Sequence, residues 1–423
     1  MFAKIGAILE TATARQSVLT TASTFVNGFL GAGFYFLLAR FLHSTQYGIF
    51  ALMVAAISML ADVADFGSNQ SLIRFIPEHK LNPGKLNQVI NFVFLTKITS
   101  GLAITGIVTL FAAFISGHIL GRPEIASLMP VVGLGVLAQL LFSFSTSITQ
   151  AQERFWEWSG LFVATNATRI ILIIILFTLG LLSGTTSVLA YIAIPFLGFL
   201  ASLVFIKFKI DPGNFADINV AKIFKFNGWV SAFIVVASVG ARVDTFLTGK
   251  LISLAAVGVY ALANQVVSIL PQLTGAIGAV TSPKYSSFNS LAKNITYTTK
   301  ATYLTTGVAI ASSLIIIPLG LLIFRFTGSE YVAGVGPMIV LLLAMCIFLV
   351  TSPIRDSILY FFTKPQFFFW LGIVHVFQTI ALSYVFIPRY QIMGSALTVL
   401  LGQVLIAAAS ITYYIYACRA HHS

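Results

Sequence analysis

Two aspartates, Asp62 and Asp65, lie three residues apart in the stretch ADVADFGSNQSLIRF, directly after the apolar run YGIFALMVAAISML. Residues at positions i and i+3 share one face of a helix. Two carboxylates at that spacing could bind a proton or a cation and couple transport to an ion gradient. A wetted helix end explains the same residues equally well, so both interpretations stay open.

Two cations, Arg169 and Lys97, lie deep within apolar runs. Arg169 comes thirteen residues after Trp156, which places it roughly 20 Å along a helix, and Lys97 lies roughly 15 Å along its own helix. A charge at the centre of a spanning helix costs about 2.5–3.5 kcal/mol, so such a residue faces a cavity or a partner. We predict that both cations bind an anionic substrate, because arginine above all suits phosphate oxygens. A structural salt bridge is the alternative for Arg169.

A second charged motif, ARVD, places Arg242 and Asp244 two residues apart within another apolar run. On a continuous helix such residues point about 200° apart, so they cannot pair with each other. We predict Arg242 as a further substrate ligand and Asp244 as a further candidate for ion coupling. The alternative is a helix end whose charges reach the outer headgroups.

Membrane-spanning helices must position all these residues. Of the 423 residues, 58% are hydrophobic and only 9% are charged, where a soluble domain has about 25% charged residues. The apolar runs are continuous rather than alternating, which excludes transmembrane strands. The sequence therefore predicts an all-α integral membrane protein with about twelve helices. Their expected ranges are 17–39, 47–66, 87–115, 125–149, 156–181, 186–208, 223–248, 255–282, 300–325, 335–360, 366–387 and 392–416.

An internal repeat relates the two halves of the chain. When the sequence is shifted by 210 against itself, 47–52 (YGIFAL) matches 257–262 (VGVYAL), including the glycine, and basic residues follow the fourth and the tenth helix at the same shift. Chance similarity between apolar runs is the alternative. Because six is an even number, both halves cross the membrane in the same sense. We predict two parallel, pseudo-symmetric six-helix bundles, 1–210 and 211–423, with the substrate near the midplane between them.

The formal net charge of +12 is explained by the side of the membrane on which the basic residues fall. With the N-terminus in the cytosol, most lysines and arginines lie on the cytosolic side, as the positive-inside rule requires. We therefore predict a multi-pass protein of the cell membrane with both termini in the cytoplasm and no nucleic-acid partner. The charged residues Lys4, Glu10 and Arg15 precede a full-length span, so we expect no cleavable signal peptide.

Motifs for several other chemistries are missing from the sequence. It contains no Walker motif, no zinc signature and no G-x-S-x-G elbow, and its two cysteines have neither pairing nor metal spacing. We therefore predict no enzyme activity, no cofactor and no metal. A membrane glycan polymerase or ligase, the alternative from a different class, generally needs a large outer loop, and the outer loops predicted here are short.

Three stretches resemble one family. The segments LARFLHSTQYGIFAL, ADFGSNQSLIRFIPE and ARVDTFLTGKLISLAAVGVYALA resemble those of polysaccharide-biosynthesis (Wzx-type) flippases in the multidrug/oligosaccharidyl-lipid/polysaccharide (MOP) exporter superfamily. The resemblance covers essentially the whole chain in length, helix count and termini. Its motifs are shared in looser form with lipid II flippases and with drug antiporters.

This resemblance implies a V-shaped pair of six-helix bundles, as in MATE and other MOP transporters. Such a protein moves an undecaprenyl-diphosphate-linked oligosaccharide from the cytosolic to the outer leaflet by alternating access, with membrane lipids and polysaccharide polymerase or ligase machinery as partners. Family members typically have a cationic central cavity, which Arg169 and Lys97 fit by position. A drug/cation antiporter of the same superfamily is the alternative, and it predicts an acidic pocket instead.

Overall fold

The computed structural model describes residues 12–206, 208, 215 and 217–420. Among these residues, twelve helices are long and apolar enough to cross a membrane, and no strand is present. The predicted all-α membrane fold is therefore confirmed. We expect no cleavable signal peptide at the N-terminus, and the residues before 12 lie outside the described part of the chain. The predicted boundary at 210/211 lies outside it too and stays a prediction.

The chain divides into two compact units. Unit 1 comprises Met1–Phe41 and Met53–Val235, and unit 2 comprises Leu42–Leu52 and Val236–Ser423. The first turns of one long helix thus belong to unit 2 while its remainder belongs to unit 1. Each unit is described below by itself.

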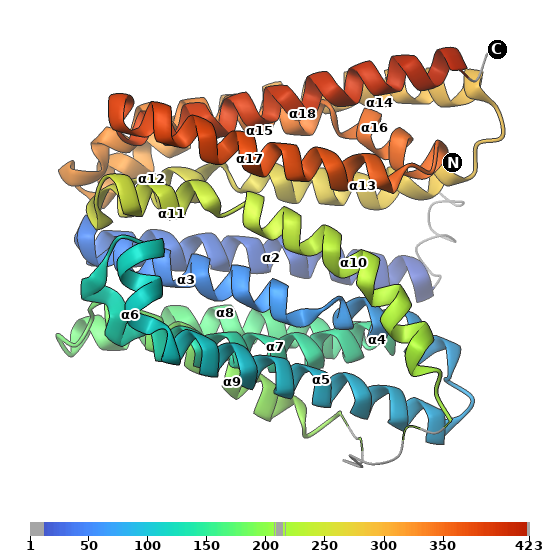
Figure 1. Cartoon of the computed structure of the whole chain (residues 1–423), viewed down its shortest axis with the longest axis horizontal. Helices are drawn as coiled ribbons and strands as arrows, with labels where there is room; N and C mark the ends of the chain where they lie inside the picture. The colour runs from blue at the N-terminus through green and yellow to red at the C-terminus, as the bar shows by residue number, and fades with distance from the viewer. Residues whose placement is uncertain (1–11, 207, 209–214, 216, 421–423) are drawn as a thin grey trace. The chain divides into compact units, whose positions relative to one another are not determined.

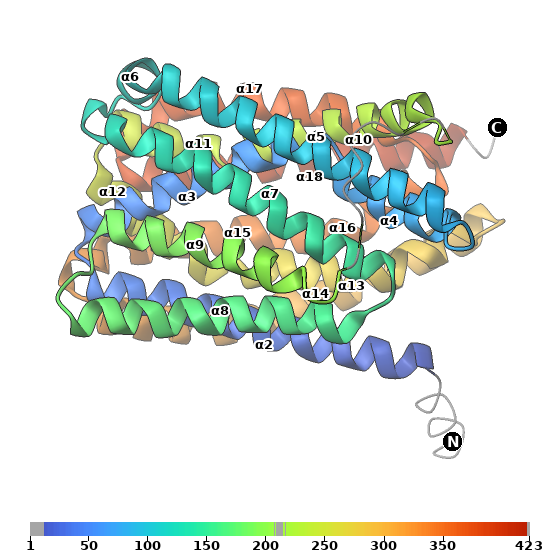
Figure 2. The ribbon, with the colours of Figure 1, turned by 90° about the horizontal axis from the view of Figure 1, so that it is seen from below.

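Unit 1 is a bundle of helices from the first half of the chain, together with most of the helix that follows (Figure 1). Its spans are continuously apolar, and capping residues mark several ends: the Asn82 side chain accepts a hydrogen bond from Lys85 N at 3.1 Å, and Pro83 takes the first helical position. Figure 2 shows α8 beside α2 and α9. The elements are α2 (Ala12–Phe41), α3 (Ser44–Asp65), α4 (Ser68–Glu78), α5 (Pro83–Leu110), α6 (Ala112–Phe114), η1 (Ile115–Ile119), η2 (Pro123–Leu128), α7 (Met129–Ala151), α8 (Phe155–Thr178), α9 (Gly184–Ser202) and α10 (Val220–Gly240).

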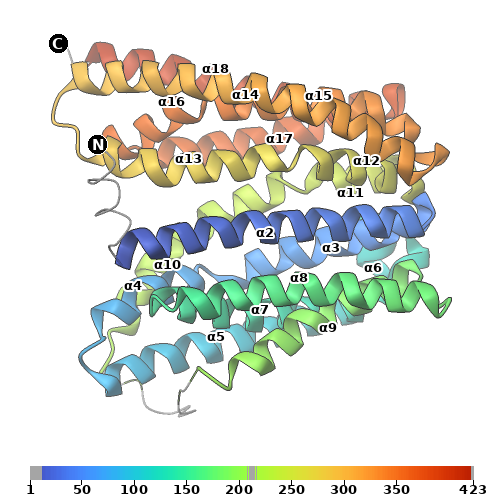
Figure 3. The ribbon, with the colours of Figure 1, turned by 180° about the vertical axis from the view of Figure 1, so that it is seen from behind.

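Unit 2 contains the second half of the chain, and its longest helix, α14, runs along α15 and α16 (Figure 3). The seventh span, predicted as one helix over 223–248, is instead broken between α10 and α11 at Ala241 and Arg242. The elements are α11 (Val243–Leu251), α12 (Leu254–Val267), α13 (Ile269–Ser286), α14 (Leu291–Thr327), η3 (Ser329–Gly334), α15 (Val335–Val350), α16 (Ser352–Asp356), η4 (Ser357–Phe361), α17 (Pro365–Tyr390) and α18 (Ile392–Ala420).

The internal repeat recurs in the helix ends. The helices α3 and α12 begin at Ser44 and Leu254, two positions related by the shift of 210, and the same shift relates the first residues of α8 and α17. The turns before α8 and α17 also correspond, because Glu153 and Thr363 both adopt positive φ, 58° and 53°. A positive φ is uncommon in residues other than glycine, so its recurrence at the same shift supports two pseudo-symmetric halves.

Two glycines related by the repeat touch each other within unit 2. A Cβ atom built on Gly48 would lie 1.8 Å from the carbonyl oxygen of Leu254, and one built on Gly258 would lie 2.1 Å from that of Ser44. Ser44 and Leu254 are themselves related by the shift of 210. This reciprocity is the packing expected around a two-fold axis, and it requires glycine at both positions because the obstacle is backbone.

The start of α3 is held in unit 2 by η3. The Glu330 carboxylate accepts hydrogen bonds from Ser44 N at 3.0 Å and Ser44 Oγ at 2.8 Å. The adjacent Tyr331 hydroxyl donates to the carbonyl oxygen of Leu42 at 3.1 Å. A carboxylate at a helix N-terminus is favourable because it satisfies free N–H groups and opposes the helix dipole. These bonds explain why the α2–α3 turn groups with unit 2.

Candidate functional site

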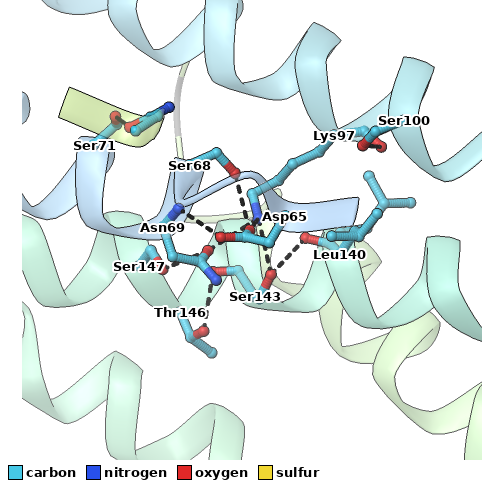
Figure 4. Close-up of polar contacts among 12 residues, drawn as sticks. Asp65, Ser68, Asn69, Ser71, Lys97, Ser100, Leu140, Ser143, Thr146 and Ser147 are labelled. Carbon is cyan, nitrogen blue, oxygen red and sulfur yellow. Dashed lines mark hydrogen bonds and ion pairs between the residues drawn. The ribbon is translucent and has the colours of Figure 1, made fainter. Parts of the chain in front are cut away.

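A buried ion pair joins Asp65 and Lys97 in unit 1 (Figure 4). Asp65 ends α3 because Phe66 and Gly67 both adopt positive φ, 48° and 68°, which no helix continues. This bend also frees Ser68 Oγ and Asn69 N to donate to the two carboxylate oxygens, at 2.9 Å and 3.2 Å. The carboxylate at the end of α3 is thereby held by two donors from the start of α4.

The Lys97 ammonium group is fully enclosed, since its side chain is 0% exposed. Besides Asp65, it donates to Asn69 Oδ1 and Ser143 Oγ, both at 3.0 Å. An ammonium group has three donors, and all three are used here. Ser147 of α7 completes the cluster by donating to Asn69 Oδ1 at 2.9 Å. Lys97 therefore neutralises Asp65, and its predicted role as a substrate-facing cation does not fit this arrangement.

Asp62 does not share the surroundings of Asp65. Its side chain is exposed, whereas Asp65 is 6% exposed and paired with Lys97. Asp65 is thus neutralised by a cation from α5, and a site shared by the two carboxylates stays a prediction.

Arg169 of α8 lies near the middle of its span and is half-buried. Its guanidinium carbon lies 4.2 Å from the ring centroid of Tyr191 in α9, and its Nη1 donates to Asn166 at 3.3 Å. Asn166 in turn donates to Asn27 of α2. No carboxylate lies within ion-pair distance of Arg169 among the described residues, and its Nε is buried without a hydrogen-bond partner. The salt-bridge alternative is not realised, and a cation remains to be neutralised.

Asp244 occupies the first turn of α11 and is 4% exposed. Its carboxylate accepts hydrogen bonds from Tyr260 Oη at 2.5 Å and from Thr245 N at 2.8 Å. No cation lies within ion-pair distance of it in the described part of the chain. It is therefore an enclosed group rather than one that reaches the outer headgroups.

Arg242 stands at the break between α10 and α11 and is half-buried. Broken helices in membranes expose backbone groups that only a cavity, a partner or an ion can satisfy, and they mark binding sites in many transporters. The break interrupts the continuous helix on which the expectation for Arg242 and Asp244 depended, so their relative orientation stays a prediction. Arg242 lies at the break itself, and Asp244 lies in the first turn of the helix that follows.

Sequence reasoning missed the polar partners of these charges. Ser143 and Ser147 are four residues apart in the serine-rich run FSFSTSITQ and so share one face of α7, which was a usable signal. Tyr260 had a signal in the repeat: the shift of 210 maps Asp244 and Tyr260 onto Phe34 and Phe50, both of which are buried. A polar pair at two otherwise apolar positions indicates a specific contact.

Comparison with known proteins gives a family match and several structural matches. The model of the family described as "Polysaccharide biosynthesis protein" matches residues 13–289. No curated protein matches the chain. The lipid II flippase MurJ, in an inward closed conformation, aligns with a TM-score of 0.67 and 16% identity, covering 94% of this chain and 87% of that one.

Two further transporter structures show the same fold. An inward-facing multidrug resistance MATE family transporter of the MOP superfamily aligns with a TM-score of 0.69 and 14% identity, covering 95% of both chains. A MOP superfamily transporter from Pyrococcus furiosus, reported to have a binding pocket of reverse polarity, aligns with a TM-score of 0.57 and 11% identity, covering 96% of this chain and 94% of that one. At these identities the likeness establishes the fold alone.

Proposed function

Because the chain belongs to the polysaccharide biosynthesis protein family, we propose that it flips a polyprenyl-diphosphate-linked oligosaccharide from the cytosolic to the outer leaflet. Transport would proceed by alternating access, as the twelve-helix fold shared with MOP transporters allows. The proposal includes the predicted orientation, with both termini in the cytoplasm. It also includes a polysaccharide polymerase or ligase as a downstream partner.

The observation that carries the proposal is the unneutralised guanidinium of Arg169. A diphosphate cannot cross hydrocarbon without a counter-charge, and a half-buried arginine at mid-span depth supplies one. Tyr191 and Asn166 hold the group in place while leaving Nε free. A drug/cation antiporter would need an acidic group at this depth of the span. The charged side chain found there, Arg169, is a cation instead.

The other predicted ligands differ in their availability. Arg242 is half-buried at a helix break and stays a candidate ligand for an anionic group. Lys97 could meet the substrate only after losing Asp65, Asn69 and Ser143, so we assign it a supporting role.

Replacing Arg169 tests the function directly. In cells that depend on this protein, Arg169→Ala is expected to reduce surface polysaccharide at least about ten-fold, because a charge-assisted hydrogen bond contributes about 1.5–3 kcal/mol and about 1.4 kcal/mol is a factor of ten. Arg169→Lys keeps the charge without the forked geometry and is expected to retain part of the export. Arg325→Ala, an exposed arginine at the end of α14, is the matched control. Equal export from Arg169→Ala and wild type would refute the role of Arg169.

We further propose that Asp244 couples transport to an ion gradient. A buried carboxylate with no cation within ion-pair distance needs a proton or a metal cation to lower the cost of its burial. Asp65 already has Lys97, and Asp62 is exposed, so Asp244 is the strongest of the three predicted coupling residues.

Asp244→Asn keeps the shape of the side chain and removes its charge. In vesicles loaded with a fluorescent lipid-linked oligosaccharide, the variant is expected to flip substrate down the lipid's own gradient at the wild-type rate. It should no longer respond to an imposed proton or sodium gradient, while Asp62→Asn should respond as wild type does. If Asp244→Asn responds to the imposed gradient as the wild type does, Asp244 does not couple transport to the gradient.

A further inference from the structure

A groove follows the side of α14 that meets α15, α16 and α18. It consists of two neighbouring pockets, each with a cavity volume of about 300 Å³. The first pocket is lined by residues of α14 from Thr306 to Ile317 and by residues of α15. The second pocket is lined by residues of α14 from Thr298 to Tyr303, by Ile354 of α16 and by Tyr414 of α18. Thr306, which lines the first pocket, and Thr302, which lines the second, lie one helical turn apart, so both pockets follow the same side of α14.

The central part of the groove is apolar although it contains hydroxyl groups. Ser313 Oγ donates to the carbonyl oxygen of Ala309 at 2.8 Å, and Thr306 Oγ1 donates to that of Thr302. Because these hydroxyls are satisfied within α14, their carbon atoms, together with Ile310 and Leu314, form the wall. Leu314 is 71% exposed, so the wall faces the lipid phase in a spanning helix.

One end of the groove is polar and cationic. Thr298, Thr299, Tyr303 and Tyr414 bring hydroxyl groups to this end, and tyrosine is typical of the membrane interface. The exposed cations Lys293, Lys300 and Arg419 lie in the adjoining turns of α14 and α18, whose ends meet on one side of unit 2 (Figure 1). The carboxylate of nearby Asp356 is engaged by Thr281 Oγ1 at 2.7 Å. This end therefore complements an anionic headgroup.

The length of the groove selects the kind of lipid. Its lining on α14 runs from Thr298 to Ile317, nineteen helical steps, which is about 29 Å at about 1.5 Å per step. The hydrocarbon core is about 30 Å thick, so an acyl chain of a phospholipid fills only about half of this length. A long isoprenoid chain fills all of it.

We propose that this groove binds the prenyl chain of the lipid-linked substrate, with its phosphate at the Lys300 end. This inference rests on the proposed flippase function and adds a docking site for the tail on the lipid-facing surface of unit 2, which the lipid occupies before its headgroup crosses; Arg169 serves the headgroup during the crossing. A tail held at the lipid-facing surface never has to cross the interior of the protein.

Photo-labelling of the wild-type protein tests the location. The probe is a polyprenyl phosphate with a diazirine in its isoprenoid chain, added to phosphatidylcholine vesicles that contain the full-length protein. We expect the label on 298–317 and on 346–354, with unlabelled polyprenyl phosphate competing and phosphatidylglycerol not competing. A label on other helices, or equal competition by phosphatidylglycerol, would overturn the proposal.

A variant whose side chain fills the groove provides the second test. Ser313→Trp places an indole in the centre of the groove, and Ile315→Trp places one on the exposed face two residues away, at 65% exposure in the native protein. We expect the first variant to bind polyprenyl phosphate about ten-fold more weakly than the second, because the isoprenoid chain loses its van der Waals contacts with the groove wall. Equal binding by the two variants contradicts the proposal.

The two proposals fail in different ways. Export that persists in Arg169→Ala would refute the proposed function and leave the labelled positions unchanged. Labelling outside the groove would refute the tail site and leave the export result for Arg169 unchanged. Should Ser313→Trp not fold, the labelling of the wild-type protein still decides the question.

Discussion

Asp65→Leu is expected to destabilise the protein more than any other single change in the polar cluster of unit 1. It removes the counter-charge of Lys97, whose side chain is 0% exposed, and leaves an ammonium group with only Asn69 and Ser143 as acceptors. Removing one partner of a buried ion pair costs about 3–5 kcal/mol. The measurement is the fraction of purified protein that remains monodisperse in detergent after heating.

The double variant Asp65→Leu/Lys97→Met distinguishes charge from packing. It replaces both charges with apolar side chains of similar size, a change that is often neutral or stabilising for buried pairs, so most of the lost stability should return. Asp62→Leu, on the exposed side of the same helix, is the control and should change stability by no more than about 0.5 kcal/mol. A double variant as unstable as Asp65→Leu would show that the ion pair is not what the cluster depends on.

The twelve spans could be predicted from the sequence because membrane insertion imposes a local rule. Each span needs a continuous apolar run of about 20 residues, and the runs are visible without any tertiary information. The break at Ala241 and Arg242 escaped that rule. Its run is apolar on both sides of a charged pair, so hydropathy alone favours one uninterrupted helix.

Partners of the buried charges depend on which helices lie side by side, and this is tertiary information. Asp65 and Lys97 are 32 residues apart in the sequence, and they meet only because the end of α3 lies beside α5 and α7. Depth within each span was predicted well enough to identify Lys97 as buried. That Asp65 would be its counter-charge was not foreseen, and binding of substrate by Lys97 stays a prediction.

The repeat offers a way to recognise such pairs in advance. At the shift of 210, Asp65 and Lys97 both fall on glycine, at Gly275 and Gly307. Asp244 and Tyr260 both fall on phenylalanine. In each pair, both members are missing together from the other half, which is what a contact specific to one half predicts. The shared scaffold is instead marked by positions that are identical in both halves, and the second residue of the matched motif, Gly48 and Gly258, is the clearest of them.

Gly48→Ala is expected to destabilise the protein by about 3 kcal/mol, the upper end of the usual cost of overpacking. The added methyl group would lie 1.8 Å from the Leu254 carbonyl oxygen, and backbone cannot move aside as a flexible side chain can. Gly258→Ala should have a similar effect through the Ser44 carbonyl oxygen, at 2.1 Å. The measurement is again survival of monodisperse protein on heating.

Two comparisons make this prediction specific to the contact of α3 with α12. Gly307→Ala, where a Cβ atom meets nothing within 4 Å, should leave stability unchanged or slightly higher, because alanine favours a helix over glycine. The double variant Gly48→Ala/Gly258→Ala should lose less than the sum of the single losses, because both methyl groups press on the same contact and the first already separates the helices. Full additivity would mean that the two glycines act at independent places, and the reciprocal packing around the repeat axis would then have to be abandoned.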